Sequence, residues 1–381
     1  MIPPLSSPAC LITTDDELQA LVDTLAAEPT IAVDTESNSL HAYQGRVCLI
    51  QISTRSQDYI VDPVSINQIA PLGHIFASER IEKVFHACEY DILCLKRDFG
   101  FEINNLFDTL YAARVIDGKM WGLGDLLHAH YGIKPDKSHQ LDDWGKRPLP
   151  AESLLYAQMD THYLLPLYDY YTARLVERDA LEEIRALFYD ISRIDPKEHS
   201  FDPKGFWKLV RPQELDKRGL AILAELYQLR DQIAQDLDTP PHRAIDNRTL
   251  VRMAAQPPRN HHDLNAVRGL HPDVVRHYAD DLLRAVEHGL TAPPPRPPRS
   301  APVDRALTER YILLHNWRKE RAIARGLESN MVLSKHTLWQ IAKRFPRTLE
   351  ELAQIDGMTP WRTATYGCEI LRLLHGKNSP C

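Results

Sequence analysis

The stretch Thr30–Asn38, TIAVDTESN, decides how the first half of this chain folds. Its apolar run, IAV, reads as a buried strand and leads directly into Asp34 and Glu36. Because residues i and i+2 of a strand point to one side, both carboxylates would share one face. Two like charges side by side in a partly buried site are costly unless a cation joins them. The stretch therefore predicts a strand that ends in a cation site, whose other ligands come from elsewhere in the chain.

The spacing of apolar residues after this stretch changes repeatedly between the two-residue period of strands and the 3.6-residue period of helices. Strand-like runs RVCLIQIST and DYIVDP follow it, then a helical run SINQIAPLGHIF, a strand-like EKVFHA and a helical CEYDILCLKRDFG. Three closely spaced strands followed by strand–helix alternation predict a mixed α/β sheet covered by helices. From about Pro212 onward only helical periodicity remains, which predicts an all-α second half.

The helical half contains an internal repeat. Shifting the chain by 88 residues without a gap gives 13 identities over the 57 positions 230–286, among them Gly269 on Gly357. Such self-similarity predicts two homologous helical domains. The proline-rich stretch TAPPPRPPRSAP, residues 291–302, separates them and favours an extended polyproline spacer. The alternative for this stretch is a ligand for an aromatic groove.

Composition narrows the class of protein. The chain has 381 residues, 44% of them hydrophobic, with no run near the roughly 18 apolar residues that span a bilayer. We expect a soluble protein without a secretion signal or membrane partner. Its six cysteines form no C-x-x-C pair, so neither a zinc site nor a disulfide framework is predicted, and a reducing cytoplasm is the expected compartment.

Charge is distributed unevenly along the chain. Residues 1–200 hold 17 Lys and Arg against 31 Asp and Glu, whereas the remaining residues hold 28 against 21. An acidic first half joined to a basic second half suggests that the first half binds cations and the second half binds polyanions. The alternative is that solvated surfaces simply differ between the two halves.

Partners for the first two carboxylates occur in two helical runs. Asp91 falls in the first turns of the helix that follows EKVFHA, and Tyr156 and Asp160 are four apart in LLYAQMDTHYLL, hence on one helix face. Four carboxylates without cysteine or clustered histidine are an all-oxygen set that suits Mg²⁺ or Mn²⁺. Two such ions could clamp the attacking and leaving oxygens of a phosphoryl displacement.

The order of these motifs resembles the tyrosine-bearing branch of the DEDD family of 3′→5′ exonucleases, the branch that contains ribonuclease D. The matching words are AVDTES, FHACEYDILCL and YAQMDTHYLLPLY, and KSHQLDDWGKRPL resembles the stretch that precedes the third motif in that branch. The repeat in the back half looks like two helicase-and-RNase-D C-terminal (HRDC) domains. The resemblance implies a ribonuclease-H-like, mixed five-stranded sheet with flanking helices, followed by two all-α helical-bundle domains.

The resemblance also implies roles for the five motif residues and two divalent metal ions, Mg²⁺ or Mn²⁺. Asp34, Glu36 and Asp160 would hold the ion that activates water, and Asp34 would bridge to the second ion, to which Asp91 binds directly or through water. The hydroxyl of Tyr156 would orient the attacking water. Positioning is its expected role, because a free tyrosine has a pKa near 10.

Several residues near the motifs are candidates for RNA contact, each with a structural alternative. His86 could approach the substrate phosphate or be a satisfied core residue. Lys137 and Arg147 could contact phosphates or pair with local aspartates. In the second repeat, Gly357 and Arg362 belong to a turn that resembles a phosphate-binding helix–hairpin–helix, the alternative being a plain turn in a bundle.

These observations combine into one prediction of organisation and function. We expect an exonuclease domain at residues 1–200, HRDC-like domains at 212–290 and 303–381, and a linker at 291–302. The predicted activity is a metal-dependent 3′→5′ exoribonuclease, a monomer that trims the 3′ ends of tRNA precursors and other structured RNAs and releases nucleoside 5′-monophosphates. The alternatives are a DNA 3′→5′ exonuclease and a catalytically inactive RNA-binding scaffold.

Overall fold

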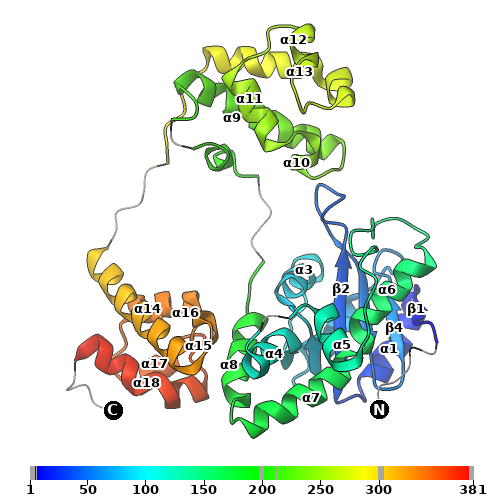
Figure 1. Cartoon of the computed structure of the whole chain (residues 1–381), viewed down its shortest axis with the longest axis vertical. Helices are drawn as coiled ribbons and strands as arrows, with labels where there is room; N and C mark the ends of the chain where they lie inside the picture. Colours follow the sequence, from blue (N-terminus) through cyan, green and yellow to red (C-terminus); the bar gives the residue numbers. More distant parts are fainter. Residues whose placement is uncertain are drawn as a thin grey trace. The chain divides into compact units, whose positions relative to one another are not determined.

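The computed structural model describes residues 5, 7–119, 121–196, 201–211, 213–298 and 304–376 (Figure 1). The chain forms two compact units, of which one comprises Met1–Glu36, Val47–Pro196 and Pro302–Cys381, and the other Ser37–Arg46 and Lys197–Ala301. The boundaries predicted at 200, 212 and 303, and the last residues of the 291–302 linker, lie outside the described residues.

The first unit is built on a six-stranded mixed sheet with the strand order β1-β4-β3-β2-β5-β6. The strands are β1 Cys10–Ile12, β2 Thr30–Ser37, β3 Val47–Ser53, β4 Asp58–Val61, β5 Glu82–Phe85 and β6 Leu106–Asp108. β3 and β4 are antiparallel, whereas β1 pairs with β4, β2 with β5 and β5 with β6 in parallel. The mixed sheet with flanking helices is as predicted, but it has one strand more than the five that the family resemblance implies, and β1 is an edge strand of only three residues.

Helices pack around this sheet and bury it, so that the residues of β3 are all buried. They are α1 Asp15–Leu25, α2 Ala70–Ala77, α3 Glu89–Phe99, α4 Thr109–Asp117, α5 Leu123–Tyr131, α6 Ala151–His162, α7 Leu164–Glu177 and α8 Leu181–Ser192. Local sequence fixes their ends: Thr14 and Glu17 form a capping box at α1, and Gly100 ends α3 in the left-handed conformation. We call residues 10–36 and 47–196 the sheet domain.

The back half folds as two helical domains, which confirms the predicted repeat. The first contains α9 Lys217–Asp236, α10 Pro241–Ala244, α11 Asn247–Ala255, α12 His261–Asn265 and α13 Pro272–Thr291, preceded by the 3₁₀ helix η1 Gly205–Lys208. The second contains α14 Arg305–Arg325, α15 Ser329–Val332, α16 Lys335–Arg344, α17 Leu349–Ala353 and α18 Pro360–His375. Each α-helix of the first domain begins 88 residues before its counterpart in the second. The buried Arg230 and Arg318 donate to equivalent carbonyls, those of Ile245 and Leu333.

The second helical domain packs against α8 of the sheet domain. Met331 of α15 is buried in the apolar core of the sheet domain. Arg325 pairs with Glu183 at 2.5 Å, and the fully buried Arg362 pairs with Asp190 at 2.8 Å. A buried pair of this kind fixes the register of two surfaces more than it stabilises them.

Two further expectations can be compared with the described residues. None of their helices is both long and apolar enough to cross a membrane. Cys10, Cys48, Cys88 and Cys94 are not disulfide-bonded. Cys368 on α18 is disulfide-bonded, a bridge that the cysteine spacing did not predict.

Candidate active site

The first two carboxylates stand where β2 leaves the core. Ile31, Ala32 and Val33 are fully buried, whereas Asp34 and Glu36 are half-buried. The buried run therefore holds the strand in place, and the alternation of side chains brings both carboxylates to one side. Thr35 lies between them, and its hydroxyl donates to Oδ1 of Asp91 at 2.5 Å.

Asp91 is positioned by the turn that joins β5 to α3. The buried carboxylate of Asp108 accepts the backbone N–H groups of Ala87 at 3.1 Å and Cys88 at 2.9 Å, and it also caps α4 through Leu110 N–H at 2.8 Å. These bonds hold Ala87 at φ +62°, a conformation that alanine rarely adopts. The turn starts α3 at a fixed place, so Asp91 in its first turn faces β2.

Helix α6 carries Tyr156 and Asp160 one turn apart, and their side chains are hydrogen-bonded to each other. Another side of the helix is anchored to the sheet by a buried polar network. Asp58 of β4 accepts a bond of 2.7 Å from Gln158 and lies 2.7 Å from His162 Nδ1. Because this network fixes the rotation of α6, it also fixes where Tyr156 and Asp160 point.

These three elements bring the carboxylates together. Carboxylate oxygens of Asp34, Glu36 and Asp160 all lie within 4.8 Å of one another, and Asp91 adjoins them through Thr35. Such a set offers hard oxygen ligands only, as Mg²⁺ and Mn²⁺ prefer. The residues present therefore fit the divalent cation that the stretch TIAVDTESN predicts.

The electrostatics of the site point the same way. Burial, followed by repulsion from neighbouring carboxylates, raises the pKa of Glu36 to about 9 and that of Asp34 well above its usual range. Burial also raises the pKa of Asp91 and of Asp160 to about 7 in each case. Without a cation, the cluster thus resists ionisation near neutral pH; a bound cation would remove that resistance.

Tyr156 remains protonated in this setting. Burial is the main cause that raises the pKa of its hydroxyl, and the negative charge of Asp160 adds to it. A protonated phenol can donate one hydrogen bond and accept another. Its chemical capacity here is therefore to orient a neighbouring molecule, such as water.

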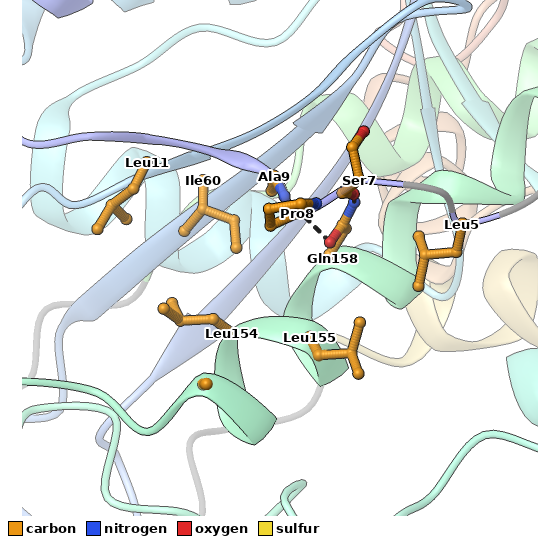
Figure 2. Close-up of a pocket in the computed structure, with 10 residues that line it drawn as sticks. Leu5, Ser7, Pro8, Ala9, Leu11, Ile60, Leu154, Leu155 and Gln158 are labelled. Atoms are coloured by element: carbon orange, nitrogen blue, oxygen red, sulfur yellow. Dashed lines mark hydrogen bonds between the residues drawn. The ribbon is translucent and has the colours of Figure 1, made fainter.

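An apolar pocket of about 410 Å³ borders α6 (Figure 2). Apolar side chains of Leu11, Ile60 and Leu154 line it, and Gln158 is its one amide, bonded to Ala9 N–H at 3.1 Å. None of the clustered carboxylates is among the lining residues. The pocket offers no group for phosphodiester chemistry, so the carboxylate cluster is the candidate active site.

Two residues predicted to contact RNA from the sheet domain make hydrogen bonds within the protein, and their contact with RNA stays a prediction. The guanidinium of Arg147 grips Asp62 with bonds of 2.7 Å and also donates to the carbonyls of Trp144, Lys146 and Cys48. Its donors are thus engaged within the protein. His86 is half-buried and hydrogen-bonded to Thr109, and burial lowers the pKa of its imidazole.

The predicted contact at the second repeat is corrected. Arg362 is fully buried, and its Nη1 donates to Asp190 and to the carbonyl of Gly357. Gly357, at φ +86°, is buried as well, with Asp190 close to it. This turn is therefore covered by α8, which sequence spacing could not reveal. Lys137 is exposed, and its contact with RNA stays a prediction.

Some positioning residues were not predicted. No sequence pattern marks Thr35, although its hydroxyl donates to Asp91. The sequence does not distinguish Asp108 from the other acidic residues. Its role is evident only from the three hydrogen bonds that its carboxylate accepts from backbone N–H groups. The negative charge of Asp142 also acts on Glu36 and raises its pKa, although no motif in the sequence marks Asp142.

Comparison with known proteins supports this site. A family model described as a 3′-5′ exonuclease matches residues 10–175, and the HRDC domain model matches twice, at residues 219–286 and 308–374. All five residues of the candidate site lie within the first match. The two HRDC matches coincide with the two helical domains.

Individual relatives extend the comparison. The exosome complex component 10 homolog of Caenorhabditis elegans is 34% identical over 284 residues, which are 74% of this chain but 32% of that protein. The ribonuclease D of Acidiphilium cryptum is 29% identical over 373 residues, 96% of this chain and 93% of the relative. Among solved structures, the catalytic core of RRP6 from Trypanosoma brucei superposes with a TM-score of 0.69 at 31% identity, covering 76% of this chain and 81% of that one. The chain thus spans a third of the first relative and nearly all of the second.

Proposed function

Because this chain belongs to the ribonuclease D and Rrp6 family of 3′→5′ exoribonucleases with HRDC domains, we propose that it trims the 3′ ends of tRNA precursors and other structured RNAs. The reaction is hydrolysis of the terminal phosphodiester, which releases a nucleoside 5′-monophosphate and leaves a new 3′-hydroxyl. The observation that carries the proposal is the convergence of Asp34, Glu36 and Asp160 within 4.8 Å, beside Asp91 and Tyr156. The protein would act as a monomer in the cytoplasm.

The proposal assigns the four carboxylates to two divalent ions, Mg²⁺ or Mn²⁺. Asp34, Glu36 and Asp160 would hold one, and Asp34 and Asp91 the other. When bound, such ions acidify water and stabilise the charge that develops on the leaving 3′ oxygen. The chain supplies the framework: β2 fixes two ligands, Asp108 fixes the turn that presents Asp91, and the network around Asp58 fixes α6.

Tyr156 would position the attacking water rather than take its proton. Its raised pKa keeps the phenol neutral, and its O–H is already directed to Asp160. The phenolic oxygen then remains free to accept a hydrogen bond from water on the side of the scissile phosphate. A water held by that bond lies next to the carboxylates of Asp160 and Glu36.

Thr35 would keep Asp91 in a fixed orientation. A hydroxyl donor at 2.5 Å occupies one oxygen of that carboxylate and leaves the other for a cation or a coordinated water. This division explains how a carboxylate outside the closest cluster still contributes to the site.

The test is a polarity and substrate assay with matched variants. Purified protein with Mg²⁺ or Mn²⁺ is given a 5′-labelled RNA with a tRNA-like body and a single-stranded 3′ extension. The matching DNA and the same RNA ending in a 3′-phosphate are the comparison substrates. We expect stepwise shortening of the hydroxyl-ended RNA with 5′-monophosphate products, and slow or no attack on the other two.

Two variants make the assay decisive. Asp34→Asn should abolish shortening, whereas Asp169→Asn, an exposed aspartate paired with Arg55, should not change it. If the protein hydrolyses the DNA faster than the RNA, the substrate class is DNA and not RNA. No attack on either, or equal activity of Asp34→Asn and wild type, would contradict the proposal and favour a binding scaffold.

A further inference from the structure

The second helical domain has a surface on which aromatic and basic side chains gather. We call it the aromatic–basic face; it comprises Tyr311, His315 and Lys319 on α14 and Lys335, Trp339 and Lys343 on α16. The rings of Tyr311 and Trp339 stack with centroids 4.1 Å apart and planes 15° from parallel. Trp339 is 37% exposed, although it is a large hydrophobic side chain.

Helical spacing sets cations around this stack. Lys335, Trp339 and Lys343 follow one another at intervals of four, as do Tyr311, His315 and Lys319, so each trio lies along one side of its helix. Helix α16 contains Lys335, Lys343 and a further arginine but no acidic residue. The stacked pair is therefore flanked by positive charge, the combination that binds single-stranded nucleic acid.

The first helical domain provides an internal control, because the 88-residue repeat places a counterpart at every position. The counterparts of the six residues, in the same order, are Leu223, Tyr227, Asp231, Asn247, Val251 and Ala255. None is a cation and one is acidic. The aromatic stack and its lysines thus belong to one copy of the repeat and are not needed for the fold.

The equivalent surface of the first domain is covered by protein. Phe201 stacks on Tyr227 with centroids 5.4 Å apart, and the hydroxyl of Tyr43 donates to Asp231 at 2.9 Å. Leu215, from the segment before α9, lines a cavity together with Val251. One copy therefore uses this face for contacts within its own unit, whereas the other presents a base-sized aromatic and positive charge.

We propose that the aromatic–basic face binds single-stranded RNA, with a base stacked on Trp339 and phosphates contacted by Lys335 and Lys343. This inference rests on the proposed function for the choice of RNA as the ligand. Stacking on an aromatic ring accepts any base, and lysine contacts read only the backbone, so the site would hold RNA without selecting sequence. Such a site would retain an RNA between successive hydrolytic steps.

The test measures binding of the full chain to a single-stranded RNA of about 20 nucleotides in EDTA, where no hydrolysis occurs. Trp339→Val introduces the residue of the other copy and should weaken binding about tenfold, since stacking on one base contributes about 1–3 kcal/mol, whereas Trp339→Phe should restore most of it. Leu313→Ala, a truncation of an exposed apolar residue elsewhere on α14, is the matched control and should leave binding unchanged. A melting curve confirms that each variant is folded.

Two further arms separate stacking from charge. Replacing several bases by abasic sites should weaken binding to wild type but have no further effect on Trp339→Val. Lys335→Gln with Lys343→Gln should lower the slope of log K against log salt by about 1.4, since each contact with a single strand contributes about 0.7. Equal binding by Trp339→Val and wild type, or no sensitivity to abasic sites, would overturn the proposal.

A separate readout distinguishes this inference from the proposed function. Hydrolysis of a four-nucleotide RNA with Mn²⁺ should be as fast in Trp339→Val as in wild type, because so short a substrate needs only the carboxylate site. If wild type binds RNA through Trp339 but hydrolyses none, the proposed function fails and the binding face stands. If wild type hydrolyses RNA normally but Trp339→Val binds RNA as tightly as wild type, the binding face fails and the proposed function stands.

Discussion

Replacing Asp160 by asparagine should stabilise the metal-free protein at alkaline pH while abolishing its activity. The ordinary pKa of an aspartate is 3.8, and burial raises that of Asp160 to about 7. At about 1.36 kcal/mol per pKa unit, ionising this group in the folded state costs on the order of 4 kcal/mol. The asparagine side chain carries no charge, but it forms a weaker hydrogen bond with Tyr156, a loss of about 1 kcal/mol. We therefore expect Asp160→Asn to raise the free energy of unfolding by roughly 2–3 kcal/mol at pH 8.5.

The size of this stabilisation depends on pH. The folded protein keeps Asp160 protonated up to about pH 7, whereas the unfolded chain releases that proton near 3.8. The stability that comes from binding this proton is fully present below the unfolded pKa and is lost as pH rises through the folded one. The gain from Asp160→Asn should consequently shrink at pH 5, where most of the wild type is still protonated.

Urea denaturation in EDTA at pH 5 and pH 8.5 measures the effect. Asp169→Asn is the control; as a half-exposed surface residue it should change the free energy of unfolding by less than about 0.5 kcal/mol at either pH. If Asp160→Asn is no more stable than wild type at pH 8.5, burial and repulsion do not oppose the ionisation of the clustered carboxylates. The cluster would then need no cation to offset its charge, and the reasoning behind the cation site would be refuted.

Three further predictions concern single contacts. Thr35→Val removes the hydroxyl that donates to Asp91 and should lower kcat about tenfold with little change in RNA affinity. Thr35→Ser keeps a hydroxyl and should retain activity. An unchanged kcat in Thr35→Val would exclude the positioning role of Thr35. Tyr156→Phe should lower kcat by about 10–100-fold without changing Mn²⁺ affinity, and wild-type kinetics would show that the hydroxyl does not orient water. Arg362→Met leaves Asp190 buried without its partner and should lower the free energy of unfolding by about 3–5 kcal/mol, measured by urea denaturation at pH 8. Adding Asp190→Asn to the same chain should restore much of this loss. No recovery in the double variant would contradict the pairing.

The sequence was most informative where chemistry and periodicity coincide. Asp34 and Glu36 directly follow a fully apolar run, and the two-residue period of a strand places them on one face. Tyr156 and Asp160 are four residues apart, and the period of a helix places them on one side of α6. The repeat was predictable for the same reason, since two copies of one pattern impose one register of helices. These features need no knowledge of contacts between distant segments.

Long-range contacts account for what could not be predicted. Arg362 looks like a surface cation beside a turn, and only the packing of α18 on α8 buries it against Asp190. Arg147 likewise depends on Asp62, 85 residues away in the chain. The donors that align the site, such as Thr35, carry no pattern of their own, because one hydroxyl in a strand has no periodic signature.

If β2, α3 and α6 together form one site for divalent cations, the protein should bind Mn²⁺ there. Electron paramagnetic resonance can count bound Mn²⁺ at pH 7.5 in the presence of a nucleoside 5′-monophosphate, the proposed product. We predict two ions per wild-type chain, loss of both in Asp34→Asn and no change in Asp169→Asn. Equal Mn²⁺ binding by Asp34→Asn and wild type, or no binding by wild type at millimolar Mn²⁺, would contradict the assignment of these carboxylates as ligands.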